Sequence, residues 1–177
     1  MIRFIFIFSS RLLTFTIQTH RPGVRYKSMK VKDVVKEAVV VSENDTFADA
    51  LKALTTQPTN TLLVTDDHGK LVGEVTVADL LDAMIPDTLD GSEVMEHFKD
   101  DDAFVASIEV ARSIPVSEFM SQDFSSLNME DDFLAIVSTA IAHQQVRIPV
   151  VDEHNHPVGI ISRQGLKQIL NNFMKAS

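Results

Sequence analysis

Two short stretches of the sequence place a glycine and a hydroxyl side chain at the same spacing. The first, GEVTVAD, contains Gly73, Thr76 and Asp79. The second, GIISRQG, keeps the hydroxyl as Ser162 but ends on Gly165. A hydroxyl three residues before a carboxylate forms a capping box, which satisfies free backbone amides at the start of a helix. Such a cap contributes about 1 kcal/mol and needs no ligand. Only the first stretch carries a complete box, because the second has a glycine in place of the carboxylate.

A pair of histidines is the second candidate for chemistry. His154 and His156 lie two residues apart in DEHNHP, with Asp152 and Glu153 beside them. Imidazole and carboxylate groups ligate transition metals. Histidines in such a stretch are more often polar turn residues, and we predict a turn and no metal site.

The sequence lacks the short motifs of common enzymes. It contains no G-x-x-x-x-G-K-[ST] loop, no H-E-x-x-H, no G-x-S-x-G and no EF-hand loop. Acid and base groups from distant parts of a chain can still meet in a cleft, so the missing motifs lower the expectation of catalysis without excluding it. We predict that the protein is not an enzyme.

Composition limits the classes of partner. The chain has 177 residues, 45% of them hydrophobic, and no cysteine, so it can bury a core but holds no disulfide or thiolate site. The net charge is −9, and residues 29–177 alone carry −14 because the first 28 residues contain five basic and no acidic side chains. An acidic surface repels a nucleic-acid backbone. We therefore expect no nucleic-acid partner, and a cytoplasmic location fits the lack of cysteine.

The basic N-terminal segment, residues 1–28, stands apart from the rest. Its apolar runs are interrupted by Arg11 and fall short of the roughly 20 residues that span a membrane. It could be a secretory signal, a transit-like peptide, or codons upstream of a start at Met29. We favour the last interpretation and predict no membrane partner.

An internal repeat organises the rest of the chain. Shifting the sequence by 86 residues superimposes NTLLVTDDHGKLVGEVTVADLL on VRIPVVDEHNHPVGIISRQGLK without gaps. A fixed period of this kind indicates two copies of one structural unit. Identical pairs include Asp45/Asp131, Phe47/Phe133, Asp66/Asp152, Gly73/Gly159 and Leu80/Leu166.

Each copy alternates between helix and strand periodicity. A short β run, AVVVS or FSSLN, precedes an amphipathic helix, then come two apolar runs separated by a polar turn and a closing helix. The unit is therefore β-α-β-β-α, and the fold class is α/β, with two repeats packed pseudo-symmetrically through small sheets. Apolar spacing predicts buried faces on the helices, formed in the first copy by Phe47, Ala50, Leu51, Leu54, Val77, Leu80, Leu81 and Met84, and in the closing helix of the second by Leu166, Ile169, Leu170 and Phe173.

The ordered set of motifs resembles the paired cystathionine beta-synthase (CBS) domain, or Bateman module. The resemblance rests on VKDVV and VSEFM, on SENDTFADAL and NMEDDFLAIV, on IPVVDEHNHPVGIIS, and on the G-x-x-[ST]-x-x-D pattern in GEVTVAD. It divides the chain into repeat 1 (residues 29–85), a linker with a helix near Phe104 to Val110 (residues 86–115) and repeat 2 (residues 116–175). In this family the cleft between the repeats binds adenosine-containing ligands, whose occupancy regulates another protein.

The resemblance assigns roles to residues of repeat 1. Thr76 would donate to a phosphate oxygen, and Asp79 would accept from both ribose hydroxyls. Adenine would lie against Val40 and the backbone near Leu62 and Leu63. The family's glycine is Gly73, which would admit a close approach of the ligand or of a neighbouring chain.

The second copy departs from the pattern. Ser162 keeps the hydroxyl, and Arg163 and Arg147 are suited to phosphate, although each could equally be an exposed surface charge. Gly165 replaces the ribose carboxylate, and losing a hydrogen bond to a charged group costs about 1.5–3 kcal/mol. We therefore expect unequal sites, with the competent ribose contact at Asp79.

The resulting prediction is a regulatory module that senses an adenine nucleotide (AMP, ADP or ATP). Magnesium is expected only if the nucleotide brings it. The resemblance also implies a homodimer and an unidentified regulated protein. Two alternatives stay open: an adaptor whose cleft is empty, favoured by Gly165 and the acidic body, and a metal-responsive module built on His154 and His156.

Overall fold

The computed structural model describes residues 2–8, 11–17, 29–85, 93–94, 98, 101–143 and 147–176. For residues 2–8, 11–17, 101, 173 and 176 it describes the backbone alone. Within the segment excluded from the fold prediction, β1 (Ile2–Phe8) and β2 (Arg11–Ile17) form an antiparallel hairpin that pairs with no other described strand. The hairpin was not predicted from the sequence.

Repeat 1 contains the predicted β-α-β-β-α unit. Its elements are β3 (Val39–Ser42), α1 (Phe47–Thr56), β4 (Thr61–Thr65), β5 (Leu71–Thr76) and α2 (Val77–Met84). The sheet order is β3-β4-β5, with β3 and β4 parallel and β4 and β5 antiparallel. Helix α1 starts at Thr46, whose side chain accepts from the Asp49 amide while Asp49 accepts from the Thr46 backbone. This capping box sets the helix start next to the end of β3.

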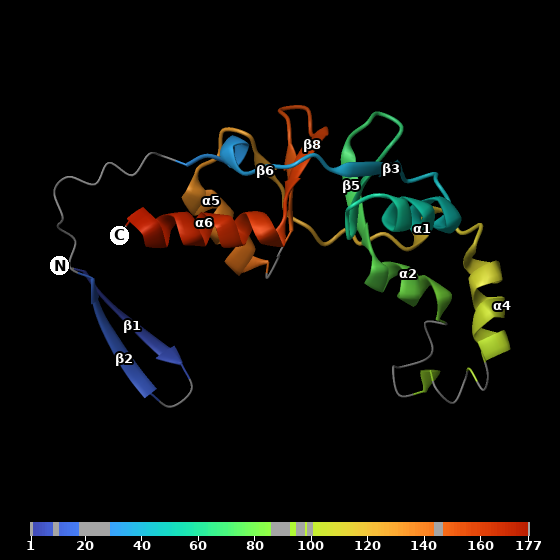
Figure 1. Cartoon of the computed structure of the whole chain (residues 1–177), viewed down its shortest axis with the longest axis horizontal. Helices are drawn as coiled ribbons and strands as arrows, with labels where there is room; N and C mark the ends of the chain where they lie inside the picture. Colours follow the sequence, from blue (N-terminus) through green and yellow to red (C-terminus); the bar gives the residue numbers. More distant parts are fainter. Residues whose placement is uncertain are drawn as a thin grey trace.

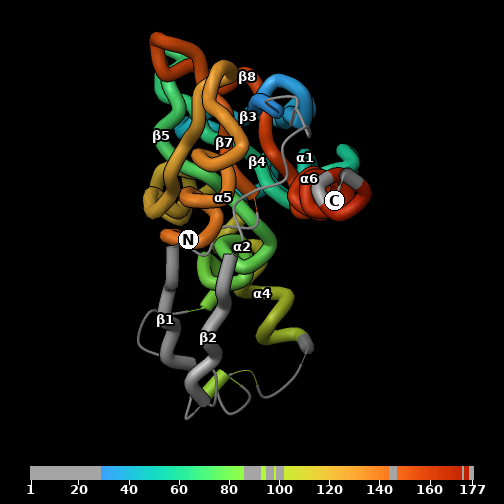
Figure 2. The backbone as a smooth tube through the Cα atoms, turned by 90° about the vertical axis from the view of Figure 1, so that its left-hand side faces the viewer, coloured from blue at the N-terminus to red at the C-terminus, as the bar shows by residue number. Residues whose placement is uncertain are grey.

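Repeat 2 contains the same unit, so the predicted α/β fold of two repeats is confirmed. Its elements are β6 (Leu127–Asn128), α5 (Phe133–Ala142), β7 (Ile148–Val151), β8 (Pro157–Ile161) and α6 (Arg163–Ala176), with sheet order β6-β7-β8. In Figure 1 the strands of both repeats lie towards the centre and the helices lie at the two ends. Viewed along the long axis, the labelled strands of the two repeats lie in the upper part and α2 and α4 in the lower part (Figure 2).

The linker contains the predicted helix. Helix α4 (Asp101–Ala111) includes the expected apolar positions Phe104, Val105, Ile108 and Ala111. It lies next to α2, and Ile108 shares an apolar groove with Phe47 and Leu51 of α1. The linker residues 86–92, 95–97 and 99–100 are outside the described residues.

Four predicted core positions on the helices are exposed instead. Leu51, Val77, Leu81 and Leu170 expose 39%, 53%, 45% and 59% of their surface. Each helix is covered by its own sheet on one side only, and Phe47, Ala50, Leu80 and Ile169 occupy that side. The apolar stripe is therefore wider than the sheet that covers it. The side chain of Phe173 is outside the described set.

Each repeat completes its core with the segment that leads into the other repeat. We name residues 29–36 lead-in 1 and residues 114–121 lead-in 2. Val31 of lead-in 1 is fully buried in the core of repeat 2, next to Leu127 and Ile148. Val116 of lead-in 2 is fully buried in the core of repeat 1, next to Phe47. The two repeats therefore fold as one interlocked unit.

A charged cluster and a third apolar cluster reinforce the exchange. Glu130 accepts from Lys30 at 2.6 Å and from Lys32 at 2.7 Å, and these two ammonium groups lower the pKa of the Glu130 carboxyl to about 2. Lead-in 1 thus joins repeat 2 by charge as well as by burial. A separate buried cluster lies between the repeats, in which Leu63 and Leu71 of repeat 1 pack with Val151 and Ile160 of repeat 2.

The repeated glycines are the points where the exchanged segments cross the sheets. Lys36 bridges to Ile160 of β8, and Ser121 bridges to Glu74 of β5, each in antiparallel backbone pairing. A β-carbon at Gly159 would lie 2.5 Å from the Lys36 carbonyl oxygen and would overlap a methyl group of Val35. A β-carbon at Gly73 would lie 2.7 Å from the Met120 sulfur. The sequence offered two reasons for Gly73, the approach of a ligand and the approach of neighbouring backbone. The structure shows the second, with Met120 and Ser121 of lead-in 2 lying against Gly73.

Replacing Gly159 with alanine should destabilise the protein because its methyl group meets backbone that is fixed by hydrogen bonds. We expect Gly159→Ala to lower the free energy of unfolding by roughly 1–3 kcal/mol in chemical denaturation. Gly165 is the matched control, since a β-carbon there comes no closer than 3.5 Å to its neighbours. Gly165→Ala should be neutral or stabilising by up to about 1 kcal/mol. Equal effects of the two substitutions would contradict this explanation.

Candidate functional site

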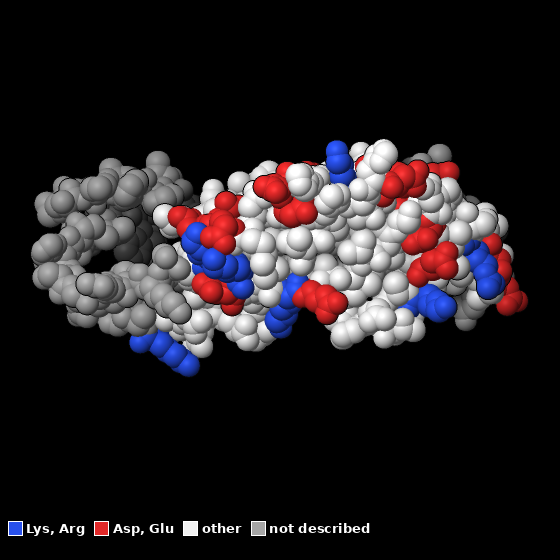
Figure 3. Space-filling model, turned by 90° about the horizontal axis from the view of Figure 1, so that it is seen from above, with Lys and Arg blue, Asp and Glu red and all other residues white. Residues whose placement is uncertain are grey.

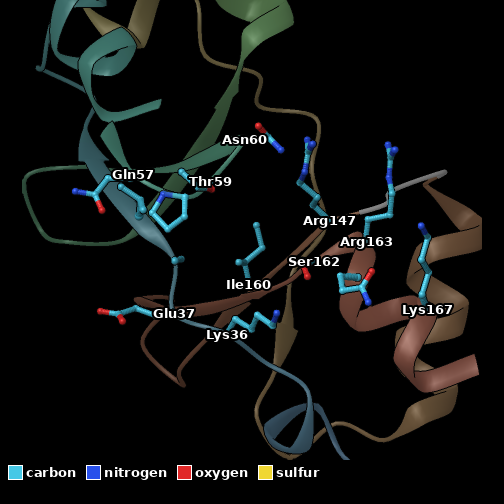
Figure 4. A pocket seen from close by; sticks show the side chains of 14 residues that line it. Lys36, Glu37, Gln57, Thr59, Asn60, Arg147, Ile160, Ser162, Arg163 and Lys167 are labelled. Carbon is cyan, nitrogen blue, oxygen red and sulfur yellow. The ribbon is translucent and has the colours of Figure 1, made fainter. Parts of the chain in front are cut away.

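A cavity of about 580 Å³ opens between the two repeats at the start of α6. Three parts of the chain that are distant in sequence form its walls: the end of lead-in 1 with the start of β3, the turn between α1 and β4, and the β7, β8 and α6 region of repeat 2 (Figure 4). Its lining residues are Lys36, Glu37, Ala38, Val39, Gln57, Pro58, Thr59, Asn60, Arg147, Ile160, Ser162, Arg163, Gln164 and Lys167.

The cavity contains three of the nine predicted site residues. Arg147, Ser162 and Arg163, which belong to repeat 2, all line it. Its lining does not include the six predicted residues of repeat 1. Leu62 and Leu63 are fully buried in β4, Gly73 lies against lead-in 2, and Val40 is a 43% exposed residue of β3 beside the lining residue Val39; the other two are Thr76 and Asp79.

Thr76 and Asp79 form the capping box that the sequence allows without a ligand. The Thr76 amide donates to Oδ2 of Asp79 at 2.6 Å, and the Thr76 hydroxyl donates to the same oxygen at 2.7 Å. In repeat 2 the box is reduced to a single bond, in which the Gly165 amide donates to Oγ of Ser162 at 3.2 Å. Both helices therefore keep a polar start, but only α2 has a carboxylate there.

Sequence reasoning missed Lys36 and Lys167, which make the cavity cationic. Together with Arg147 and Arg163 they place four basic side chains in its lining, against one acidic residue, Glu37. Arg163, Lys167 and Arg147 extend along one side of the cavity, whereas the Glu37 carboxylate points away from it (Figure 4). The available signal was the spacing of four between Arg163 and Lys167, which puts both on one face of a helix.

Glu74 was also missed, and its environment is unusual for a carboxylate. It lies on β5 with Oε2 buried and without a hydrogen-bond partner among the described residues. Burial raises the pKa of Glu74, the nearby Asp79 raises it further, and Arg147 opposes both. The hydroxyl of Thr61, at the start of β4, is likewise buried without a described partner. An acidic residue in the middle of the apolar run LVGEV was the available signal.

The histidine pair forms a turn contact between the repeats. His156 places Nδ1 3.2 Å from a carboxylate oxygen of Asp152 and Nε2 3.2 Å from the backbone oxygen of His68. Backbone amides of His156 and His154 donate to Asp152 and lower the pKa of its carboxyl. Both ring nitrogens of His156 therefore have protein partners. Among the described residues, no three His, Asp or Glu side chains come together as a metal site.

None of the helices in the described part of the chain combines the length and the apolar character needed to cross a bilayer.

The order of the elements and the duplicated three-stranded sheets agree with one family. The CBS domain matches twice, at residues 31–86 and 116–172. The chain belongs to the CBS domain family. CBS-pair proteins are generally regulatory, non-catalytic modules, and the match indicates no catalytic family.

Solved CBS structures share this fold. The CBS domain of a CBS domain-containing membrane protein from Sphaerobacter thermophilus is 28% identical, with a TM-score of 0.65, and the match covers 80% of this chain and 88% of that one. CBSX2 from Arabidopsis thaliana is 20% identical, with a TM-score of 0.65 and coverage of 84% and 99%; it has also been solved in complex with AMP.

Two further structures extend the comparison. The CBS domain pair of protein MJ0100 was solved with 5′-methylthioadenosine and S-adenosyl-L-methionine; it is 20% identical, with a TM-score of 0.60 and coverage of 82% and 98%. Protein MJ1004 from Methanocaldococcus jannaschii is 19% identical, with a TM-score of 0.60. The match covers 81% of this chain and 60% of MJ1004, so this chain corresponds to only part of that protein.

The partly buried Glu74 predicts a pH-dependent stability. Because its pKa is raised in the folded state, folding is favoured while the carboxyl is protonated and loses that advantage as pH rises from the unfolded pKa through the folded one. Glu74→Gln should therefore be more stable than wild type near about pH 7, with a difference that shrinks towards about pH 4. Denaturant titrations across this range measure it. The exposed Glu118→Gln is the control, and a pH-independent difference for Glu74→Gln would contradict the assignment.

Proposed function

We propose that the protein is a regulatory CBS-pair module that binds an adenine nucleotide in the cavity between its repeats and signals occupancy to a partner protein. The observation that carries the proposal is the cavity itself, since both repeats contribute to its wall. A ligand that contacts both repeats can favour one of their relative arrangements by its difference in affinity for the two. Regulation then needs no catalytic group.

The lining suits the parts of a nucleotide. Val39, Ala38 and Ile160 offer apolar surface to a purine ring, and the turn at residues 57–60 offers backbone polar groups beside it. Ser162 and the positive end of the 14-residue helix α6 suit a phosphate. The known complexes of CBSX2 with AMP and of MJ0100 with adenosyl compounds support an adenosine ligand.

The proposal keeps the two copies unequal, but it places the ligand in the cavity at Ser162, on the side that the sequence had favoured less. Asp79 is the carboxylate available for ribose hydroxyls in repeat 1, together with Thr76 for phosphate, and it would exchange its bonds to Thr76 for bonds to the ligand. Repeat 2 has the open cavity but Gly165 in the ribose position. Magnesium enters, in this proposal, only with the nucleotide.

A homodimer accounts for the exposed apolar helix faces. On repeat 2, Leu134 and Ile141 of α5 and Leu170 and Met174 of α6 are all more than half exposed. The related face of repeat 1 carries Leu51, Val77 and Leu81, with α4 beside it. Burying such faces between two copies removes apolar area from water. The regulated protein and a cytoplasmic location are part of the same proposal.

Calorimetric titration of the full chain with AMP, ADP and ATP, with and without magnesium, tests the site. We expect binding at about one site per chain, abolished or strongly weakened by Asn60→Trp, because this exposed cavity residue would place an indole ring at the cavity opening. His68→Trp is the control, since His68 is equally exposed in a turn outside the cavity lining. If wild type binds no adenosine ligand in calorimetry or thermal shift, the empty-cleft adaptor, supported by the exposed helix faces, replaces the sensor.

Restoring the missing carboxylate tests the ribose assignment. A β-carbon at residue 165 would make ordinary contacts at 3.5 Å or more, and repeat 1 holds an aspartate at the corresponding position, Asp79. We therefore expect Gly165→Asp to fold and to tighten nucleotide binding by roughly tenfold through a charge-assisted hydrogen bond to ribose. Gly165→Ala separates this gain from the effect of a side chain alone. The reciprocal change, Asp79→Ala, should weaken any binding in repeat 1. Unchanged affinity in both Gly165→Asp and Asp79→Ala would show that neither position contacts ribose.

A further inference from the structure

The repeat 2 residues that line the cavity include three cations, whereas the corresponding positions of repeat 1 have none, although both derive from one repeated sequence. The offset of 86 residues gives each wall residue of repeat 2 a counterpart in repeat 1. Four of these pairs differ in the same direction: Arg147 corresponds to Thr61, Ile160 to Glu74, Arg163 to Val77 and Lys167 to Leu81. At three of these positions repeat 2 has a basic residue and repeat 1 has an uncharged one. At the fourth, repeat 1 has the carboxylate of Glu74 and repeat 2 has the apolar Ile160.

The four cations of the cavity are Lys36, Arg147, Arg163 and Lys167. Arg147 is near enough to Glu74 to oppose the rise in the pKa of that carboxyl, but none of the four forms an ion pair with any residue in the described ranges. Other basic residues do: Lys30 and Lys32 pair with Glu130, and Arg112 pairs with Glu109. Figure 3 shows acidic groups at several places on the visible surface. Four of the eleven basic residues after residue 28 thus line one cavity of an otherwise acidic molecule.

The corresponding region of repeat 1 carries carboxylates instead. Glu74 and Asp79 lie close enough for the Asp79 charge to raise the pKa of Glu74. Thr61, the counterpart of Arg147, is buried without a described partner for its hydroxyl. Two neighbouring carboxyl groups repel a phosphate, whereas the cationic cavity attracts one.

We propose that the cavity of repeat 2 is a polyphosphate site, which selects adenine nucleotides by phosphate charge and excludes uncharged or cationic adenosyl compounds. Arg147, Arg163 and Lys167 bind the phosphate chain from one side of the cavity. Lys36, at the end of lead-in 1, binds it from another wall. The acidic region around Glu74 directs the phosphates away from repeat 1. This assignment deepens the proposed function and rests on it for the adenosine part of the ligand.

The test is a ligand series on the full chain at about 0.05 M salt: ATP, ADP, AMP, adenosine, S-adenosylmethionine and inorganic tripolyphosphate. Affinity should rise roughly fivefold or more with each added phosphate, and the rise should diminish at about 0.5 M salt because ions screen the charges. Adenosine and S-adenosylmethionine should bind more weakly than AMP.

Variants that remove a positive charge test whether the gain in affinity per phosphate comes from the cavity. Arg163→Gln and Lys167→Gln are exposed substitutions on α6 that should reduce the gain per phosphate without weakening adenosine. Lys175→Gln, on the same helix but outside the cavity lining, should leave the series unchanged.

The possible results separate this inference from the proposed function. If adenosine or S-adenosylmethionine binds as tightly as ATP, the polyphosphate site is wrong and adenosine sensing stands. If tripolyphosphate binds as tightly as ATP while adenosine does not bind, the polyphosphate site stands and adenosine sensing fails. If no phosphate ligand binds, or if Lys175→Gln changes the series as much as Arg163→Gln does, the polyphosphate site is overturned.

Discussion

The exchange of lead-in segments between the repeats is the constraint on which the rest of the structure depends. Neither three-stranded sheet buries its apolar residues with its own unit alone, because Val31 fills the core of repeat 2 and Val116 fills the core of repeat 1. The exchange is possible only where the crossing backbone can lie directly on the sheet. Gly73 and Gly159 provide those two places, since a β-carbon at either would collide with the segment that crosses it.

The same crossing creates the cavity. Lead-in 1 pairs with β8 at Lys36 and Ile160 and then continues into β3, so its end forms one wall of the space in front of α6. The cavity wall thus contains residues that are close in space only because the chain crosses from one repeat to the other. Any change in the angle between the repeats must move this wall, which gives a bound ligand a physical route to the whole unit.

Duplication followed by divergence explains the electrostatics of the cleft. The two copies have the same residue at several core and crossing positions, such as the pairs Gly73/Gly159 and Leu80/Leu166. Exposed positions of the closing helix carry no such packing requirement, and they differ in charge between the copies, as in Val77 and Arg163 or Leu81 and Lys167. The two repeats therefore share a backbone fold because their core residues match, while their exposed side chains differ in charge.

The sequence by itself determined the repeat, the order of strands and helices, the family and three cavity residues, because these depend on periodicity and on local motifs such as the hydroxyl at Ser162. Only the tertiary structure decided which half of the cleft is open and charged. Lys36 is more than 100 residues from Arg147 in the chain, and no local pattern links them. Likewise, the exposure of Leu81 and Leu170 depends on how much of each helix its sheet covers, which apolar spacing does not specify.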